Sequence, residues 1–421
     1  MDINTSLDLN VVAVENQDRV SVLLELVAPT RDADQTRPPG TLEVVLDRSG
    51  SMGDGRLVAA QRAIESLIDR LDPSDNFGLV VFDDQAQVIV PAGPLTDKAA
   101  AVAAVRSLHL GSMTNLSGGY LRGIQEARRV VGEDGSGTLL LVSDGHANCG
   151  VTDHAQLADL ATGGRQHDLT TSTVGVGLGF DEELMGVLAR GGGGTARFGE
   201  EADEAGAAMT AEVEDLLEQS AQAAHLTVRP SGEVSAVTLL NDLPATVIED
   251  GFMVDLGDLY SGEHRRLVLE IEVPAIDGLG LAQVCELELG WVDVSEMKSE
   301  KVTLPVHVNV VPGDQAAGRI PDPIVVSERL FQEAQRAKKE AGEALRQGDR
   351  DRASHIWMTA KESLDAAIPA ASPETRDELS KESALLGDMA DRATHDDARL
   401  LSKQTENDRF FKSSRRGRRG G

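Results

Sequence analysis

The chain is poor in aromatic residues and in cysteine. Phe, Trp and Tyr make up 3% of its 421 residues, so its hydrophobic cores must consist mainly of Val, Leu, Ile and Ala. The two cysteines, Cys149 and Cys285, lie far apart in the sequence and form no CxxC pair. Zinc modules and small disulfide-stabilised domains depend on closely spaced cysteines, so we expect neither class here.

Long hydrophobic runs and basic residues are also scarce. No apolar segment approaches the roughly 20 residues of a membrane-spanning helix, and Met1 to Thr5 lack the features of a signal peptide, so we expect a cytoplasmic protein. Lys and Arg number 40 against 70 Asp and Glu, which gives a net charge of −30 and a pI near 4.6. A surface this acidic repels nucleic acids and anionic membranes, and disfavours both as main partners.

The residue pattern changes several times along the chain, which is long enough for several domains with separate cores. Strand-like, mixed, strand-like and helical segments follow one another and end in a basic, glycine-rich stretch. We predict N-terminal strands in 1–40, an α/β domain in 41–224, a β-sandwich in 225–312, a helical hairpin or bundle in 324–404, and a disordered tail in 405–421.

Residues 41–224 alternate between apolar strands and amphipathic helices such as 57–67. This alternation is typical of a doubly wound α/β domain, in which helices cover both faces of a parallel sheet. We expect an antiparallel edge from a hairpin over 77–91, a helix stop and loop at 191–194, and a long final helix at 202–224. The predicted strands are 42–46, 77–82, 138–142 and 173–176.

Residues 225–312 return to short strands separated by turns, a pattern typical of a β-sandwich. Residues 6–29 alternate polar and apolar side chains, which indicates two half-buried strands with a turn near 15–18. Because these early strands need a sheet to join, we predict that they complete the sandwich and that the α/β domain is inserted within it. The predicted sandwich strands are 225–228, 235–239, 266–271, 285–289 and 302–311.

Three helical stretches, at 324–347, 350–369 and 373–404, follow the sandwich. The first two resemble a tetratricopeptide hairpin, but one hairpin is too few to define a repeat array, and a helical bundle packed on the sandwich is the alternative. Residues 415–421 are rich in Arg and Gly, which is typical of a disordered tail that contacts the acidic body of the protein or RNA.

Oxygen-bearing side chains follow three of the predicted elements. Asp47, Ser49 and Ser51 come directly after the strand 42–46, Thr114 lies in a loop before a helix, and Asp144 ends the strand 138–142. The carboxyl ends of parallel strands meet at one edge of a sheet, where ligands of such sheets bind. Carboxylate and hydroxyl oxygens are hard ligands, so these five residues can converge on Mg²⁺, Mn²⁺ or Ca²⁺.

Residues 41–224 resemble the von Willebrand factor A (VWA) domain family. The family's metal-ion-dependent adhesion site (MIDAS) is a DxSxS run, a later threonine and a later strand-end aspartate, and Asp47, Ser49, Ser51, Thr114 and Asp144 fill these positions. The resemblance implies a Rossmann-like fold and a metal site that offers one coordination position to a carboxylate of a partner protein. Mg²⁺ is our first choice of metal, with Mn²⁺ and Ca²⁺ as alternatives.

The order of the predicted domains is similar to that of bacterial multidomain VWA proteins, and in outline to plant RING ligases, whose RING cysteines this chain lacks. The resemblance implies an intracellular scaffold or regulator without enzymatic activity. Its partner is a protein that donates an Asp or Glu carboxylate, for example an AAA-type ATPase or a component of a signalling system. In the family, a change in metal coordination is coupled to displacement of the last helix. Because the predicted helix 202–224 leads directly into the strand at 225, we expect such a displacement to change the angle between the two domains.

The sequence leaves three alternative functions open. A magnesium-dependent phosphatase could use Asp47 as its nucleophile, but phosphatases of the haloacid dehalogenase type need a second aspartate two residues later, and that position is Ser49. A Cys–His nucleophile could combine His146 and Cys149, although loop residues so close in sequence are more often bystanders. Nucleic-acid binding could rest on the arginine-rich end of the chain, with an affinity that falls as salt rises.

Overall fold

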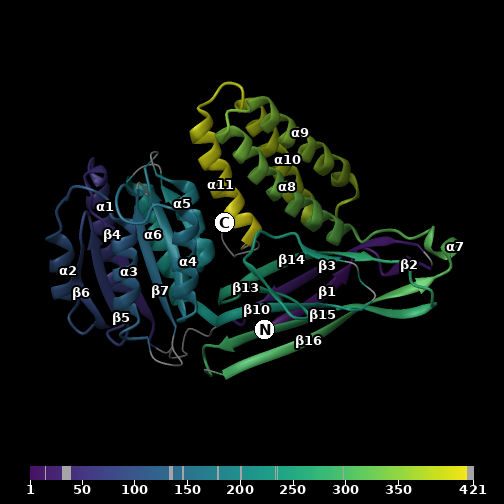
Figure 1. Ribbon diagram of the computed structural model, residues 1–421, viewed down its shortest axis with the longest axis horizontal. Helices are drawn as coiled ribbons and strands as arrows, with labels where there is room; N and C mark the ends of the chain where they lie inside the picture. Colours follow the sequence, from purple (N-terminus) through teal and green to yellow (C-terminus); the bar gives the residue numbers. More distant parts are fainter. Residues whose placement is uncertain are drawn as a thin grey trace.

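Figure 1 shows the computed structural model as an α/β domain, a pair of elongated sheets and a group of helices. Its described residues are 1–14, 16–30, 39–131, 136–144, 147–177, 180–199, 202–232, 234, 236–296 and 298–414. Residues 31–38 of the predicted N-terminal region, the residue Glu15 in its predicted turn and the basic residues 415–421 lie outside them.

The α/β domain is built on a six-stranded sheet in the order β6-β5-β4-β7-β8-β9. All neighbouring strands run parallel except β6, which pairs antiparallel with β5, so the predicted hairpin and antiparallel edge are confirmed. The strands are β4 (Thr41–Asp47), β5 (Asn76–Phe82), β6 (Ala86–Pro94), β7 (Gly137–Ser143), β8 (Leu169–Val176) and β9 (Gly193–Gly199).

Helices cover both faces of this sheet, as the apolar strands predict. One core lies under α1 (Arg56–Arg70), α2 (Lys98–Arg106) and α6 (Ala202–Leu217). The other lies under α3 (Leu116–Ala127), α4 (His154–Arg165) and α5 (Glu182–Gly191).

Two expectations for this domain were wrong in detail. The glycines after α5 lead into the edge strand β9 instead of a loop. A Cβ at Gly194 would lie 2.2 Å from the carbonyl oxygen of Thr171, so glycine lets two strand backbones approach closely. The last helix ends at Leu217, because the following residues pair with two strands of a second sheet and bury Ala221 and Ala224 completely. This pairing overrides the helix propensity of the alanine-rich segment.

The remaining strands form two sheets that share one hydrophobic core, and we call them the two-sheet unit. The first sheet has the order β1-β3-β14-β11, with β1 (Asp2–Leu7), β3 (Asp18–Val27), β14 (His264–Val273) and β11 (Ala236–Leu239). The second has the order β12-β13-β10-β15-β16-β2, with β12 (Ala245–Ile248), β13 (Gly251–Tyr260), β10 (Gln219–Pro230), β15 (Gly280–Asp293), β16 (Lys298–Val311) and β2 (Val11–Ala13). The N-terminal strands β1, β2 and β3 thus pair with each other or with strands that follow the α/β domain.

The C-terminal helices pack around one common core, which favours the bundle over the repeat array. They are α8 (Pro323–Arg346), α9 (Arg350–Ala367), α10 (Pro373–Arg392) and α11 (Ala398–Ser414), and they follow the short α7 (Gly313–Ala316). The predicted stretch 373–404 is two helices, because Arg350 donates hydrogen bonds to the carbonyl oxygens of Ala393 and Asp396 and stabilises the turn between them. Residues 405–414 belong to α11, so their assignment to a disordered tail was wrong. None of the described helices is long and apolar enough to cross a membrane.

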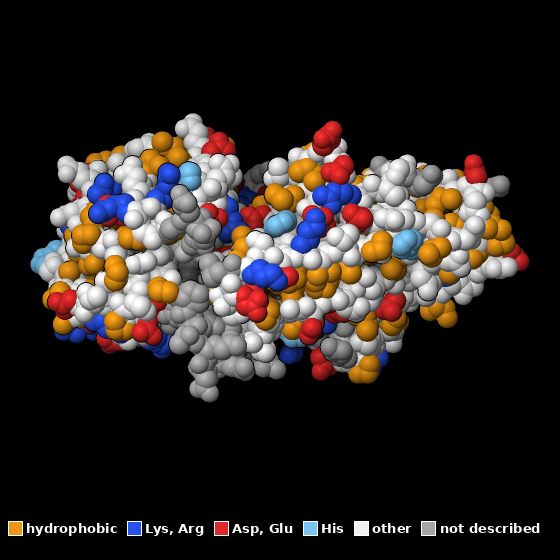
Figure 2. Space-filling view, turned by 90° about the horizontal axis from the view of Figure 1, so that it is seen from below, with side chains coloured by type: hydrophobic (Ala, Val, Ile, Leu, Met, Phe, Trp, Pro, Cys, Tyr) orange, Lys and Arg blue, Asp and Glu red, His pale blue; other side chains and the backbone are white. Residues whose placement is uncertain are grey.

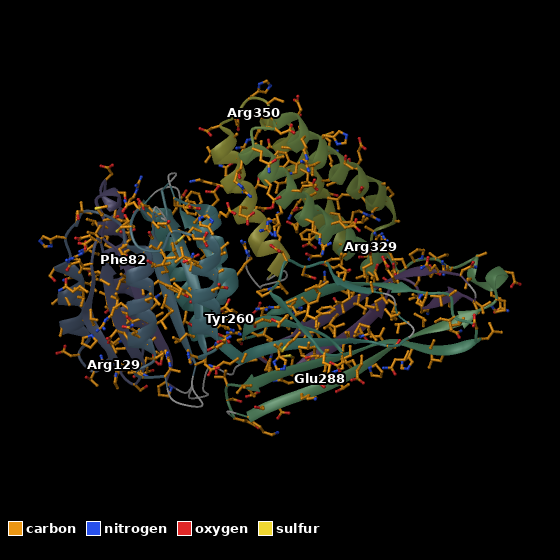
Figure 3. All side chains as sticks on the ribbon, in the orientation of Figure 1. Phe82, Arg129, Tyr260, Glu288, Arg329 and Arg350 are labelled. Carbon is orange, nitrogen blue, oxygen red and sulfur yellow. The ribbon has the colours of Figure 1, made fainter. Side chains whose placement is uncertain are left out.

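Acidic and basic side chains are interspersed on the face of the molecule in Figure 2 and do not segregate by sign. Tyr260 lies where the two-sheet unit meets the α/β domain (Figure 3), and it is buried there. At this junction the guanidinium of Arg165 donates to both carboxylate oxygens of Asp255, at 3.0 and 2.9 Å. Thr170 donates to Asp258 beside it, at 2.9 Å.

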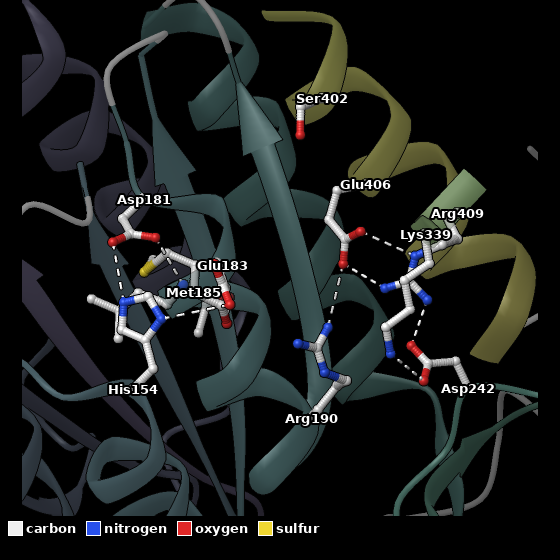
Figure 4. A network of polar contacts seen from close by, with 12 residues as sticks. His154, Asp181, Glu183, Met185, Arg190, Asp242, Lys339, Ser402, Glu406 and Arg409 are labelled. Atoms are coloured by element: carbon white, nitrogen blue, oxygen red, sulfur yellow. Dashed lines mark hydrogen bonds and ion pairs between the residues drawn. The ribbon is translucent and has the colours of Figure 1, made fainter. Parts of the chain in front are cut away.

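Helix α11 forms a second junction, between all three parts of the molecule (Figure 4). Glu406 pairs with Arg190 of the α/β domain at 3.4 Å, and the buried Arg409 pairs with Asp242 of the two-sheet unit. Lys339 of α8 contacts the same aspartate at 3.2 Å. The α/β domain is therefore held by ion pairs at two separate places.

Candidate functional site

The five predicted site residues lie in loops at the carboxyl edge of the α/β sheet, on the strand ends of β4 and β7 and in the loop before α3. Asp47 is the last residue of β4, which pairs in parallel with β7 along Leu42–Leu46. Asp47, Ser49, Thr114 and Asp144 are buried, whereas Ser51 is exposed. The site is thus an open edge with buried polar groups beneath it.

The turn after β4 is shaped by the side chain of Asp47. One carboxylate oxygen accepts the backbone N–H of Ser49 at 2.7 Å, and the other accepts the hydroxyl of Ser143 at 2.6 Å. The chain then forms a single 3-10 turn, Gly50–Met52, which brings the hydroxyl oxygens of Ser49 and Ser51 to 3.0 Å from each other. Two hydroxyls therefore lie side by side above a buried carboxylate.

Burial is the main cause that raises the pKa of Asp47 to about 6. Hydrogen bonds from Ser143 and Ser49 lower this pKa, and the neighbouring charge of Asp144 raises it. The two aspartates that sequence analysis assigned to one site therefore interact electrostatically. The glycine and histidine after Asp144, including the candidate nucleophile partner His146, lie outside the described residues.

The loop that carries Thr114 is held against the other site loops by backbone hydrogen bonds. The N–H of Gly50 donates to the carbonyl oxygen of Ser112 at 3.1 Å. The Thr114 N–H donates to the side-chain oxygen of Asn148 at 2.9 Å, and the Asn148 N–H donates back to the Thr114 carbonyl at 3.1 Å. The side chain of Asn115 then caps α3 by accepting the N–H of Gly118.

Asp83 also supports the loops of the candidate site. It is buried at the end of β5, pairs with Arg48 at 2.9 Å and accepts the Asn115 N–H through its carbonyl oxygen at 2.7 Å. Burial raises its pKa, but hydrogen bonds and the charge of Arg48 outweigh burial, and the net pKa is lowered. A Cβ at Gly111 would lie 2.1 Å from an Asp83 carboxylate oxygen, so only glycine fits there.

Ser143, at the end of β7, and Asn148, in a loop, were also missed, because single hydroxyl and amide residues carry no distinctive sequence signal. The position of Asp83 at the end of an apolar strand is the one signal that could have indicated its role. No group of three or more His, Cys, Asp or Glu side chains in the described part of the chain is arranged to hold a metal. Any cation at this edge therefore depends on hydroxyl oxygens.

Residues 42–212 match the family model of the von Willebrand factor type A (VWA) domain, so a VWA domain is assigned to this segment of the chain. YfbK of Escherichia coli strain K12 is 26% identical over 296 residues, which cover 66% of this chain and 51% of YfbK. The protein sll0103 of Synechocystis is 29% identical over 280 residues, which cover 63% of this chain and 64% of sll0103. This chain thus spans less than two thirds of either relative.

A more partial match is the E3 ubiquitin-protein ligase WAV3 of Arabidopsis thaliana, which is 28% identical over 57% of this chain and 32% of its own length. Two solved structures share the fold over most of the chain. A von Willebrand factor type A protein from Catenulispora acidiphila has a TM-score of 0.72 at 17% identity and covers 90% of this chain and 89% of its own. The ArnB paralog VWA2 from Sulfolobus acidocaldarius has a TM-score of 0.67 at 16% identity and covers 96% and 97%.

Proposed function

We propose that this protein is a metal-dependent protein-binding module without enzymatic activity. Its VWA domain would hold a divalent cation at Asp47, Ser49, Ser51, Thr114 and Asp144 and present it to an Asp or Glu side chain of a partner protein. The single observation that carries this proposal is the pair of serine hydroxyls directly above the buried carboxylate of Asp47.

The spacing of the two hydroxyls supports magnesium. Mg²⁺ prefers octahedral coordination at about 2.0–2.1 Å, so neighbouring ligand oxygens lie about 2.9–3.0 Å apart. The Ser49 and Ser51 oxygens are 3.0 Å apart without any change in side-chain position. Ca²⁺ binds oxygens at about 2.3–2.6 Å and spreads neighbouring ligands further apart in the same geometry.

The hydrogen bonds of Asp47 support a role for the metal in binding. Both of its carboxylate oxygens already accept hydrogen bonds, so Asp47 orients the Ser49 backbone and stabilises positive charge nearby. Neutral hydroxyl ligands leave much of the charge of a dication uncompensated. A bound cation would therefore supply a Lewis-acidic position that attracts an incoming carboxylate.

The same hydrogen bonds disfavour the phosphatase alternative. A nucleophilic aspartate must present a free oxygen to the substrate, whereas Asp47 is fully buried and both oxygens are engaged. The position where a haloacid dehalogenase has its acid is Ser49. Cys149 is half-buried and donates its backbone N–H to Thr114, which makes it part of the loop scaffold.

We further propose that the two-sheet unit is a β-sandwich and that the VWA domain is an insertion between its strands β3 and β10. The shared core of its sheets and the pairing of β3 with β14 support this arrangement. In such an arrangement both connections of the VWA domain lead into one rigid neighbour. This arrangement supports the scaffold role inferred from sequence, because the proposed metal site would keep a fixed position relative to the two-sheet unit.

Isothermal titration calorimetry with Mn²⁺ and Mg²⁺ tests the metal site. Alanine at both Ser49 and Ser51 removes two oxygen ligands but keeps the hydrogen bond to Asp47, which the Ser49 backbone donates. We expect Mn²⁺ affinity to fall by at least about 100-fold, since changes to supporting residues alone cost about 10–100-fold. The matched control is Ser107→Ala, an exposed serine at the end of α2, which should bind metal like the wild type. Equal affinities in the double variant and the wild type would refute the proposal.

A further inference from the structure

Three large apolar side chains are exposed beside the proposed metal site. The exposed fractions are 47% for Val58, 50% for Leu110 and 50% for Met113. Met113 directly precedes Thr114, and Leu110 lies in the same loop. We call these three side chains the apolar rim.

Contacts of neighbouring residues place the α1 face that carries Val58, and the side chain of Leu110, against the loop and the turn that carry site residues. The Gln61 side chain donates to the carbonyl oxygens of Val105 and Leu108, so this face of α1 lies against the start of the rim loop. Val58 is one helical turn before Gln61 on the same face. A Cβ at Gly53 would lie 3.9 Å from a methyl group of Leu110, which places that leucine against the turn after the serines.

Leu110 and Met113 of the apolar rim lie in a loop whose backbone is fixed by hydrogen bonds. The Gly111 N–H donates to the Arg48 carbonyl oxygen at 2.6 Å, and the next residue, Ser112, accepts the Gly50 N–H. Leu108 is buried and anchors one end of the loop, and the paired hydrogen bonds between Thr114 and Asn148 anchor the other. The side chains of Leu110 and Met113 are therefore exposed to solvent on a loop with an ordered backbone.

We propose that the partner presents its acidic residue in a segment where that residue is flanked by large apolar side chains, which pack on the apolar rim. This inference rests on the proposed function, because the rim has this meaning only if a carboxylate binds at the adjacent metal. In this view Val58, Leu110 and Met113 determine which acidic segments bind.

The charge of the whole protein supports this choice of partner. At a net charge of −30, the chain repels acidic proteins over most of its surface, so a carboxylate alone is an unfavourable partner away from the metal. Contacts between apolar side chains do not depend on this negative potential, and in protein interfaces a few well-packed, desolvated residues contribute most of the affinity. A partner segment with apolar flanks around its acid gains affinity where a uniformly acidic segment does not.

Fluorescence anisotropy of short labelled peptides on the full chain tests the inference. Each peptide has a central glutamate, or a glutamine as its control, flanked on both sides by leucine, phenylalanine or serine, and is measured with Mg²⁺ and with EDTA. In Mg²⁺ we expect the apolar-flanked glutamate peptides to bind about tenfold more tightly than the serine-flanked one. In the double variant Leu110→Ser, Met113→Ser this preference should disappear while Mn²⁺ affinity stays unchanged.

The matched control is Leu281→Ser, which removes a leucine that is 74% exposed in the two-sheet unit and should keep the tenfold preference. Equal binding of all glutamate peptides, or binding of none, by a wild type that still takes up Mn²⁺ would overturn the apolar-rim inference and leave the proposed function intact. Failure of the wild type to bind Mn²⁺ would overturn the proposed function itself. Detectable binding of glutamine and glutamate peptides with equal affinity in Mg²⁺ would also overturn the proposed function.

Discussion

Glu43 allows a sharp test of the electrostatics beneath the site. It lies in the middle of the central strand β4 and is completely buried. Neither of its carboxyl oxygens has a hydrogen-bond partner in the described part of the chain, and one of them lies against Gly78, where a Cβ would be only 1.9 Å away. Burial, with a contribution from the charge of Glu126 and against that of Arg122, raises the pKa of Glu43 to about 9.

The sign of the resulting pH dependence follows from linkage. Because the folded-state pKa exceeds the ordinary value of 4.5, the folded protein keeps a proton that the unfolded chain releases. The contribution of Glu43 to the free energy of unfolding is therefore highest below about pH 4.5 and falls as pH rises toward about 9. At pH 7 the loss amounts to about 3 kcal/mol as an upper bound, at about 1.4 kcal/mol per pH unit.

The variant Glu43→Gln keeps the shape of the neutral side chain and cannot ionise in either state. We expect its stability relative to wild type to increase by about 1.4 kcal/mol per pH unit between about pH 5 and pH 8. Urea unfolding at several pH values measures this slope, and any constant offset from packing of the amide does not affect it. Glu362→Gln, on the exposed face of α9, controls for the loss of one negative charge. A stability difference that stays constant with pH would refute the reasoning.

Three further variants test the junctions and the site loops. Arg165→Ala removes two hydrogen bonds to the half-buried Asp255 and the positive charge that interacts with the buried Asp258. It should cost about 3 kcal/mol in urea unfolding, since each hydrogen bond to a charged group contributes about 1.5–3 kcal/mol. Arg409→Ala should cost a similar amount at the second junction, where Arg409 is buried. The control Arg352→Ala breaks an exposed pair with Glu340 and should change stability by about 0–1 kcal/mol. Equal effects of Arg409→Ala and Arg352→Ala would contradict the burial of Arg409. Gly111→Ala places a methyl group against Asp83, so it should destabilise the protein by about 1–3 kcal/mol and weaken Mn²⁺ binding in calorimetry. Unchanged stability and unchanged Mn²⁺ affinity would show that the loop can shift to accommodate the methyl group.

The α/β domain could be predicted well because its signals are local. Continuous apolar strands, amphipathic helices and oxygen-bearing residues at strand ends all follow from periodicity and composition. The edge strand β9 was missed because its glycines are needed for a close approach to Thr171, a contact distant in sequence. The end of α6 was missed for the same kind of reason, since pairing with β13 and β15 decides it.

The supporting residues of the site illustrate the same limit. The predicted metal ligands follow a recognisable spacing, but their positions depend on Asp83, Ser143 and Asn148, which hold the loops through contacts between distant segments. Such residues have no pattern of their own, because any short polar side chain in a loop looks alike in a single sequence. Their roles become visible only once the sheet edge is assembled.

The structure also changes the expected consequence of ligand binding. Helix α6 ends at Leu217 and β10 begins at Gln219, so a displaced α6 would pull directly on a central strand of the two-sheet unit. The domain angle, however, is held by the half-buried pair of Arg165 and Asp255 and by the contact between Arg190 and Glu406.

Each hydrogen bond to a charged group contributes about 1.5–3 kcal/mol, so breaking both bonds from Arg165 to Asp255 costs about 3 kcal/mol or more. Coupling between sites typically amounts to about 1–3 kcal/mol. Ligand binding is therefore too weak to open the first junction, and we expect the domain angle to change only after that junction is removed. Distances between spin labels on α1 and β16, measured with Mg²⁺ and a glutamate peptide, should stay constant in the wild type and shift in Arg165→Ala. Adding Thr114→Ala to that variant should abolish the shift. A shift in the wild type would mean that the junctions yield and that the helix displacement reaches the two-sheet unit directly.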